Sequence, residues 1–356
     1  MLQRKEMTTL LINVISTKML LTFPKIMIID SGNSAWMQAI YNTAIAFLIF
    51  WVTMFFYRGN KNIITLAENF GGKTLKIIVG VVVFSVLMIN CASIIRLFPE
   101  TVKIVLLQDF KVEFIIAAFL VAIGIGAYMG IEAIGKINNM FIPIAGMVFL
   151  TFLLLLIPYY RFENILPIFG EGYKAIFVKG FNTISLFSDL LLLNILLPHC
   201  ENLYEARKSG QKAIFISGVI AVLILLSYCL IYPYPASKDF MIPVYQLSRI
   251  IHLSSFFSRF EAMFQFIWSI LMLLYSAIYI YTMCYILQTT LSLKHYKPLV
   301  FPVVVLIGII GMIPGSVIDL VKSEKLENII VYPVAFILPF LFGLVSRKYY
   351  GEKRKE

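Results

Sequence analysis

Long apolar runs separated by short polar stretches make up most of the chain. Each run is long enough to cross a bilayer, where a helical span needs about 20 mostly apolar residues. Only helices pair all backbone polar groups within such a run, because a barrel strand would be shorter and would alternate apolar with polar positions. The pattern therefore predicts an all-α membrane protein with about ten transmembrane helices, at roughly 9–29, 36–57, 75–97, 113–130, 139–159, 176–198, 213–233, 260–290, 299–318 and 329–346.

The composition agrees with lipid as the main solvent. Of the 356 residues, 60% are hydrophobic and 14% are charged, which is too apolar for a soluble globular surface. The connections between the runs are short, and none is rich in Gly and Ser. We therefore expect a single integral-membrane domain over residues 1–356.

The net charge of +11 reflects membrane topology and not nucleic-acid binding, because the basic residues form no continuous patch. Seventeen of the 30 Lys and Arg residues lie in one alternate set of loops and at the chain ends. Nine lie in the other set, and four lie within or at the edge of a run. Basic residues accumulate on the cytoplasmic side of a membrane. Both termini are thus expected to be cytoplasmic, which requires an even number of spans.

The sequence carries no signature of an enzyme or a metal site. The three histidines lie far apart, the four cysteines lack the paired spacing of zinc ligands, and neither HExxH nor a nucleophile elbow occurs. A Walker A sequence is also absent, which argues against ATP-driven pumping by this chain. We expect no catalytic residue, no metal and no cofactor.

Ionisable residues inside the apolar runs are the main candidates for a functional site. Each costs about 2.5–3.5 kcal/mol on insertion scales unless it has a partner, a wet cavity or a route to the interface. Lys18 lies in the first run beside Ser16 and Thr17. Asp189 lies in the sixth run near Ser185. Where a helix is interrupted, hydroxyl groups can donate hydrogen bonds to the backbone carbonyls that have lost their helical partners. This suggests a ligand or ion site at paired interruptions. The alternatives are a structural ion pair, or a lysine that reaches the cytoplasmic face.

Several polar residues near the ends of other runs are further candidates. Arg96 shares roughly one helical face with Asn90, and we interpret it as an anchor at a helix end more readily than as a substrate contact. Arg259 and Glu261 open the eighth run. The eighth run continues with a stripe of residues spaced by four and three, which would suit either a passage or ordinary helix packing: Glu261, Gln265, Trp268, Met272, Tyr275 and Tyr279.

Four segments carry a resemblance to a known family. They are GNSAW at 32–36, ENILPIFGEG at 163–172, SLFSDLLLLNILLPH at 185–199 and IPVYQLSRIIHLSSFFSRFEAMFQFIW at 242–268, and two further spans follow. In this order and spacing, the chain resembles the B-subunit permeases of spore nutrient germinant receptors along nearly its whole length. These permeases look like a branch of the amino acid-polyamine-organocation transporters.

The resemblance implies an inverted five-plus-five repeat of the LeuT-like fold, with repeat one at about 8–160 and repeat two at about 174–347. In that fold the interrupted first and sixth spans face each other around the substrate, which would place Lys18 and Asp189 near one cavity. Two features depart from the family. The first span has Ser-Thr-Lys in place of a glycine-rich break, and the sixth has aspartate where glutamate is expected.

The resulting hypothesis is the ligand-sensing B subunit of a spore germinant receptor. It would bind a small nutrient, expected to be an amino acid, among spans one, three, six and eight, with Trp268 and Tyr275 as walls of the cavity. The resemblance also implies an A-type subunit and a lipoprotein C-type subunit as partners, in the inner membrane of the spore. The alternative functions are a secondary transporter of an amino acid or cation, and a conduction pathway for ions or water.

Overall fold

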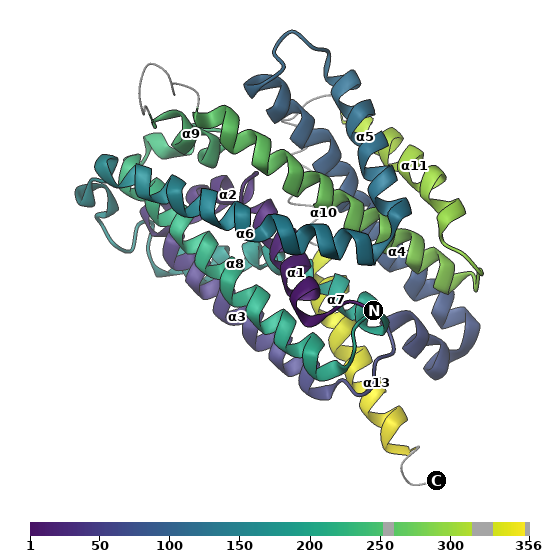
Figure 1. Cartoon of the computed structure of the whole chain (residues 1–356). Helices are drawn as coiled ribbons and strands as arrows, with labels where there is room; N and C mark the ends of the chain where they lie inside the picture. Colours follow the sequence, from purple (N-terminus) through teal and green to yellow (C-terminus); the bar gives the residue numbers. More distant parts are fainter. Residues whose placement is uncertain (252–259, 315–329, 353–356) are drawn as a thin grey trace.

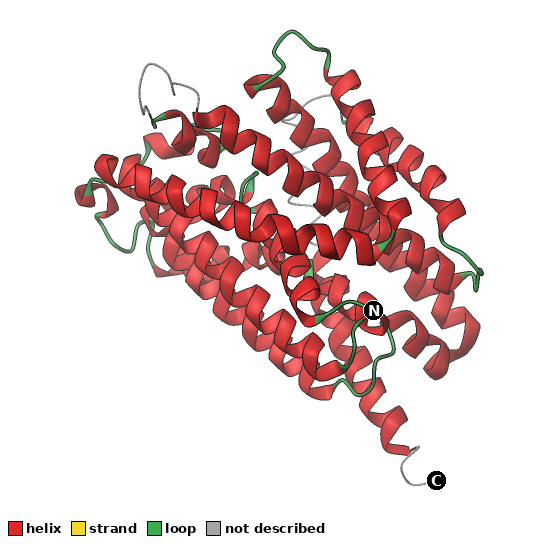
Figure 2. Cartoon of the chain, viewed as in Figure 1, coloured by secondary structure: helices red, strands yellow, loops and turns green. Residues whose placement is uncertain are grey.

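The apolar runs form helices, in which the backbone N–H and C=O groups of each run bond to one another (Figures 1 and 2). The computed structural model describes residues 1–251, 260–314 and 330–352. No β-strand occurs in these ranges. The prediction of an all-α, multi-pass membrane protein is therefore confirmed. Eight helical segments are long and apolar enough to cross a membrane: Phe23–Phe56, Ile63–Val105, Val112–Met129, Ile131–Tyr159, Ala175–His199, Leu203–Ile231, Glu261–Thr290 and Ile330–Tyr350.

The first predicted span is interrupted. It consists of α1 (Arg4–Lys18) and α2 (Phe23–Ser31), separated by a short turn. Pro24 lies in the first turn of α2, where a backbone N–H is not needed for a hydrogen bond within the helix. In a continuous helix, residue 24 would have to donate its N–H to the carbonyl four residues earlier, which proline cannot do. Gly32, with φ +59°, then turns the chain into α3 (Ala35–Phe56).

The sixth predicted span is also irregular. It begins with a π-helical turn, η4 (Ala175–Lys179), and a 3-10 segment, η5 (Gly180–Phe187). A regular helix, α7 (Leu190–Leu196), starts only after Asp189. Changes of helix type inside a span free backbone groups from the usual pattern. Two interrupted spans are thus present in the fold.

The third predicted span belongs to α4 (Ile63–Val105), which is longer than expected at both ends. A kink at Gly71 and Gly72, with φ +69° at Gly72, separates the first two turns from the rest. The kink is bridged by an ion pair of 2.9 Å between Glu68 and Lys76. The helix also continues through Pro99, so Arg96 lies inside it and not at its end, contrary to our expectation.

Helix α10 (Phe260–Thr290) packs against several other helices, among them α1, α4, α5, α6 and α11 (Figure 1). The stripe of Trp268, Met272, Tyr275 and Tyr279 is buried against these neighbours. The remaining described α-helices are α5 (Val112–Met129), α6 (Ile131–Leu156), α8 (Leu203–Ile231), α9 (Pro243–Arg249), α11 (Val300–Met312) and α13 (Leu338–Glu352).

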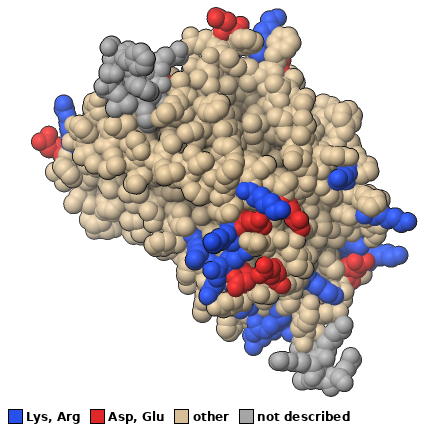
Figure 3. Space-filling model, viewed as in Figure 1, with Lys and Arg blue, Asp and Glu red and all other residues tan. Residues whose placement is uncertain are grey.

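Both ends of the described chain lie at the same end of the bundle. Leu2 donates its N–H to the carbonyl of His199 at 2.8 Å. The same end holds the Arg58 N–H, which donates to Ser346 Oγ at 2.9 Å. Charged side chains gather near this end, whereas a wide band of surface beside it carries little charge (Figure 3). Such a band suits contact with lipid, and the shared end agrees with an even number of spans.

Candidate functional site

The interruptions of the first and sixth spans meet at an ion pair. Lys18 is the last residue of α1 and Asp189 immediately precedes α7. The Lys18 Nζ lies 2.9 Å from Asp189 Oδ1, and it also donates to Ser188 Oγ at 3.3 Å. Both charged side chains are buried, with 5% and 1% of their surface exposed. The structure therefore brings the two predicted charges into direct contact.

Asp189 has a second partner from α10. The Tyr279 hydroxyl donates to Asp189 Oδ1, and the Tyr275 ring stacks on that of Tyr279 with centroids 4.7 Å apart. The other carboxylate oxygen, Oδ2, is buried and accepts no hydrogen bond from the described residues. Asp189 thus retains unused acceptor capacity inside the bundle. A buried acceptor without a partner is uncommon in folded proteins and requires an explanation.

The polar residues of α1 just before Lys18 bind three neighbouring helices. Asn13 donates to Asn138 Oδ1 of α6 at 2.8 Å and to the Leu271 carbonyl of α10 at 3.2 Å. Thr17 donates to Asn13 Oδ1 at 2.7 Å, and Ser16 donates to a serine hydroxyl of α8 at 2.9 Å. These bonds fix the end of α1 within the bundle. Sequence reasoning missed Asn13 and Asn138, although an amide inside an apolar run is a usable signal.

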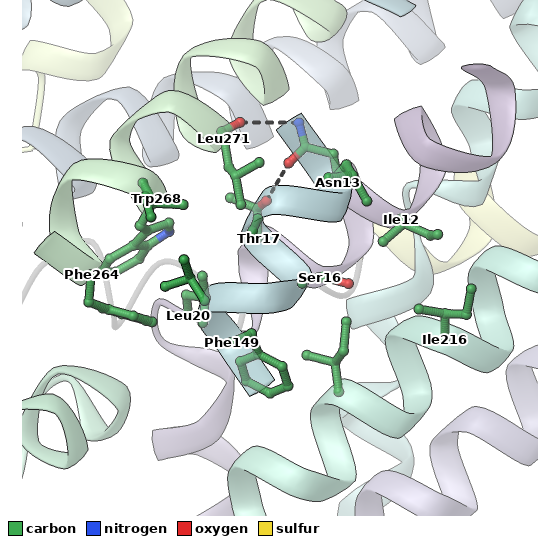
Figure 4. A pocket seen from close by; sticks show the side chains of 16 residues that line it. Ile12, Asn13, Ser16, Thr17, Leu20, Phe149, Ile216, Phe264, Trp268 and Leu271 are labelled. Carbon is green, nitrogen blue, oxygen red and sulfur yellow. Dashed lines mark hydrogen bonds between the residues drawn. The ribbon is translucent and has the colours of Figure 1, made fainter. Parts of the chain in front are cut away.

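A cavity of about 220 Å³ lies beside this part of α1 (Figure 4). The predicted residues Ser16, Thr17 and Trp268 line it, whereas Lys18, Asp189 and Tyr275 do not. Its walls come from α1 and the turn that follows it, and from α6, α8 and α10, which belong to the first, fifth, seventh and eighth spans. We expected a cavity among spans one, three, six and eight. The structure thus separates the ion pair from this cavity.

The other predicted residues bond elsewhere. Asn90 donates to the carbonyl of Val86 in its own helix at 3.1 Å. Arg96 pairs with Glu100 one turn further along at 3.0 Å. The buried Ser185 donates to the Asn182 carbonyl at 3.3 Å. Glu261 is half-buried in the first turn of α10, and Arg259 lies outside the described residues. The structure does not join Asn90, Arg96 or Ser185 to the ion pair.

A second buried polar cluster, which sequence reasoning also missed, joins α3 to η5. Gln38 and Asn42 both donate to Thr183 Oγ1, at 2.7 and 2.6 Å. Thr183 in turn donates to the Gly180 carbonyl at 2.9 Å, and the Ser31 hydroxyl donates to Gln38 Oε1. The side chains of Ser31, Gln38, Asn42 and Thr183 are all buried. This cluster holds the first half of the sixth span against the second span.

A bundle of membrane-spanning helices, with two interrupted spans that meet at a buried ion pair, defines a membrane protein of the permease type. A family model described as "Spore germination protein" matches residues 1–317. The chain belongs to the spore germination permease family, as its sequence resemblance predicted. This family is transporter-like or receptor-like and is not a known enzyme family. None of the curated proteins compared with the chain matches it.

Proposed function

We propose that the chain is the ligand-sensing B subunit of a spore germinant receptor and binds a small zwitterionic nutrient, an amino acid, at Lys18 and Asp189. One observation carries the proposal. Two opposite charges, each from the interruption of a different membrane span, are paired in the interior at 2.9 Å. Intramembrane ionisable residues of this kind mark substrate and ion pathways.

The need to keep buried charges paired favours an amino acid. A ligand with a single charge would pair with either Lys18 or Asp189 and would leave the other uncompensated, which is strongly unfavourable in a buried environment. A zwitterion replaces the internal pair by two new ones. Its carboxylate would bind the Lys18 ammonium, and its ammonium group would bind the Asp189 carboxylate. The unused Oδ2 of Asp189 supplies a further acceptor for that ammonium group.

The burial of the pair suits a sensor that must open before it binds. Lys18 and Asp189 are less than 5% exposed as whole residues, so a nutrient enters only when α1 and α7 separate. A ligand shifts such an equilibrium only as far as it binds the two conformations unequally. The proposed partners, an A-type subunit and a lipoprotein C-type subunit in the inner spore membrane, would read out that shift.

The proposal is tested by binding of the twenty amino acids to the purified protein. We expect at least one of them to bind, and Asp189→Asn to weaken its binding at least about tenfold through loss of the charge partner. Glu171→Gln, which removes a carboxylate outside the spans, is the matched control and should bind normally. Unchanged binding by Asp189→Asn would remove this residue from the site.

The competing function is a secondary transporter, which would bind the solute at the same site and then move it across the membrane. Transport and sensing differ in whether the bound solute leaves on the other side. Purified protein in liposomes, loaded on one side with the amino acid that binds, separates the two. Uptake at ordinary transporter turnover, abolished by Asp189→Asn, would replace the sensor by a transporter.

A further inference from the structure

We propose that the cavity beside α1 is a second binding site, for a small, neutral and largely apolar molecule that carries one hydrogen-bond acceptor. It is separate from the site at Lys18 and Asp189, and it does not depend on the proposed sensing of an amino acid. Sixteen residues line the cavity, among them Asn13, Ser16, Thr17 and Trp268 (Figure 4).

The walls define the charge of the occupant. None of the sixteen lining residues is Asp, Glu, Lys, Arg or His. An ionised ligand would therefore lose its water without gaining a charged partner, which is strongly unfavourable in an apolar surrounding. The same argument excludes a free amino acid, because both of its charged groups would be unpaired. The occupant must be neutral.

The polar groups of the walls define its hydrogen bonding. Asn13 uses both of its amide hydrogens and accepts the Thr17 hydroxyl, and Ser16 donates to Ser217. The Trp268 indole differs, because its Nε1 is buried and has no hydrogen-bond partner among the described residues. In Figure 4 this nitrogen lies on the edge of the ring turned toward Leu20. An indole N–H only donates, so the missing partner is an acceptor.

Size and access complete the description of the occupant. The volume of about 220 Å³ is below the range of about 300–1,000 Å³ typical of sites for drug-sized ligands. Gly146 and Ile216 line the cavity from α6 and α8 and are both exposed on the outer surface of the bundle. The cavity is therefore reached from the side that faces lipid, where a neutral apolar molecule dissolves readily.

Two probes of nearly equal shape test the site: cyclohexanone, which has a carbonyl acceptor, and methylenecyclohexane, which lacks it. The chain has three tryptophans, so Trp36→Phe combined with Trp51→Phe leaves Trp268 as the only indole reporter. We expect cyclohexanone to shift the Trp268 emission and to bind about two- to tenfold more tightly than methylenecyclohexane, the range expected for one hydrogen bond. Equal binding of both probes would overturn the proposal.

Three substitutions in the native chain test whether binding occurs in this cavity. Ala145→Leu should fill the space and abolish the effect of cyclohexanone on thermal unfolding, while Ala122→Leu, at an exposed position of α5, should leave it intact. Trp268→Phe should make the two probes equivalent. Full binding by Ala145→Leu, or an unchanged preference in Trp268→Phe, contradicts the assignment. No readout involves an amino acid, so the result stands whether or not an amino acid binds at Lys18 and Asp189.

Discussion

Two buried polar clusters hold the sixth membrane span, and they differ in charge. The amide cluster, formed by Ser31, Gln38, Asn42 and Thr183, attaches η5 to α3 through neutral side chains. The ion-pair cluster, formed by Lys18, Asp189 and Tyr279, attaches the start of α7 to α1 and α10. The first cluster lies before the interruption of the span and the second lies at it.

We infer from this difference that the sixth span combines a fixed half with a movable half. Thr183 Oγ1 accepts two hydrogen bonds and donates one, so its capacity is full. Asp189 retains a free oxygen, and its main partner is a flexible lysine that a cationic group can replace. We infer that η5 stays attached to α3 while the contact between α1 and α7 is exchangeable.

The largest effect is expected from removing one charge of the ion-pair cluster. Lys18→Met or Asp189→Asn leaves the other charge buried without a partner, and each should lower the free energy of unfolding by about 3–5 kcal/mol. The double substitution leaves neither charge and should recover most of the loss. Unfolding in mixed micelles gives the four free energies of a double-mutant cycle. Additive losses would show that the two residues do not depend on each other.

Disruption of the amide cluster should be somewhat less costly. Thr183→Val keeps the shape of the side chain but leaves the amide hydrogens of Gln38 and Asn42 without their acceptor, at about 2–4 kcal/mol in total. Thr183→Ser retains the hydroxyl and should cost about 1 kcal/mol or less. Because this cluster is assigned a structural role, Thr183→Ser should also leave ligand affinity unchanged. A loss of affinity in that variant would contradict the division into a fixed and a movable half.

The difference between the clusters also explains what the sequence predicted. Lys18 and Asp189 stand out because a charge inside an apolar run is expensive, and the family resemblance gave the reason to bring them together. The all-α membrane fold and the family followed from equally strong signals and are confirmed. The ligand-binding roles of these residues stay predictions.

The amide cluster and the cavity were missed for physical reasons. A neutral amide or hydroxyl in a span costs much less free energy than a charge, so such residues are common there. Gln38 alone therefore gives little indication of a partner 145 positions away in the chain. The cavity depends on how far α6 lies from α8, a distance that no local pattern contains. Trp268 was identified as a wall, but its unpaired N–H was visible only once its neighbours were placed.

Tyr279→Phe sharpens the comparison by removing a neutral donor from the charged cluster. Its hydroxyl donates to the Asp189 carboxylate, and a bond to a charged acceptor contributes about 1.5–3 kcal/mol. Tyr228→Phe is the matched control, because this buried hydroxyl donates to the neutral carbonyl of Ser237 at 2.7 Å. The control should lose only about 0.5–1.5 kcal/mol of unfolding free energy. Equal losses in the two variants would indicate that Asp189 carries no effective charge.

The smallest effect is expected from an ion pair outside the membrane, which calibrates the buried one. Glu171 and Lys238 lie 3.2 Å apart with 38% and 31% of their side chains exposed. Hydrogen bonds from Tyr234 and from Lys238 hold the pKa of the Glu171 carboxyl below its ordinary value. Because its pKa is lower in the folded protein, Glu171 stabilises the fold above its unfolded pKa of about 4.3. This stabilisation is lost as the pH falls through the folded pKa.

Glu171→Gln should therefore lower the free energy of unfolding by only about 0.2–1 kcal/mol near pH 7, since water screens an exposed pair. The difference between this variant and the native protein should shrink as the pH falls below about 4.3. Glu163→Gln is the control, because Glu163 forms no ion pair with a described residue. Titration of unfolding between acid and neutral pH gives both curves. If Glu171→Gln cost as much as Asp189→Asn, burial would not be what distinguishes the pair at the interrupted spans.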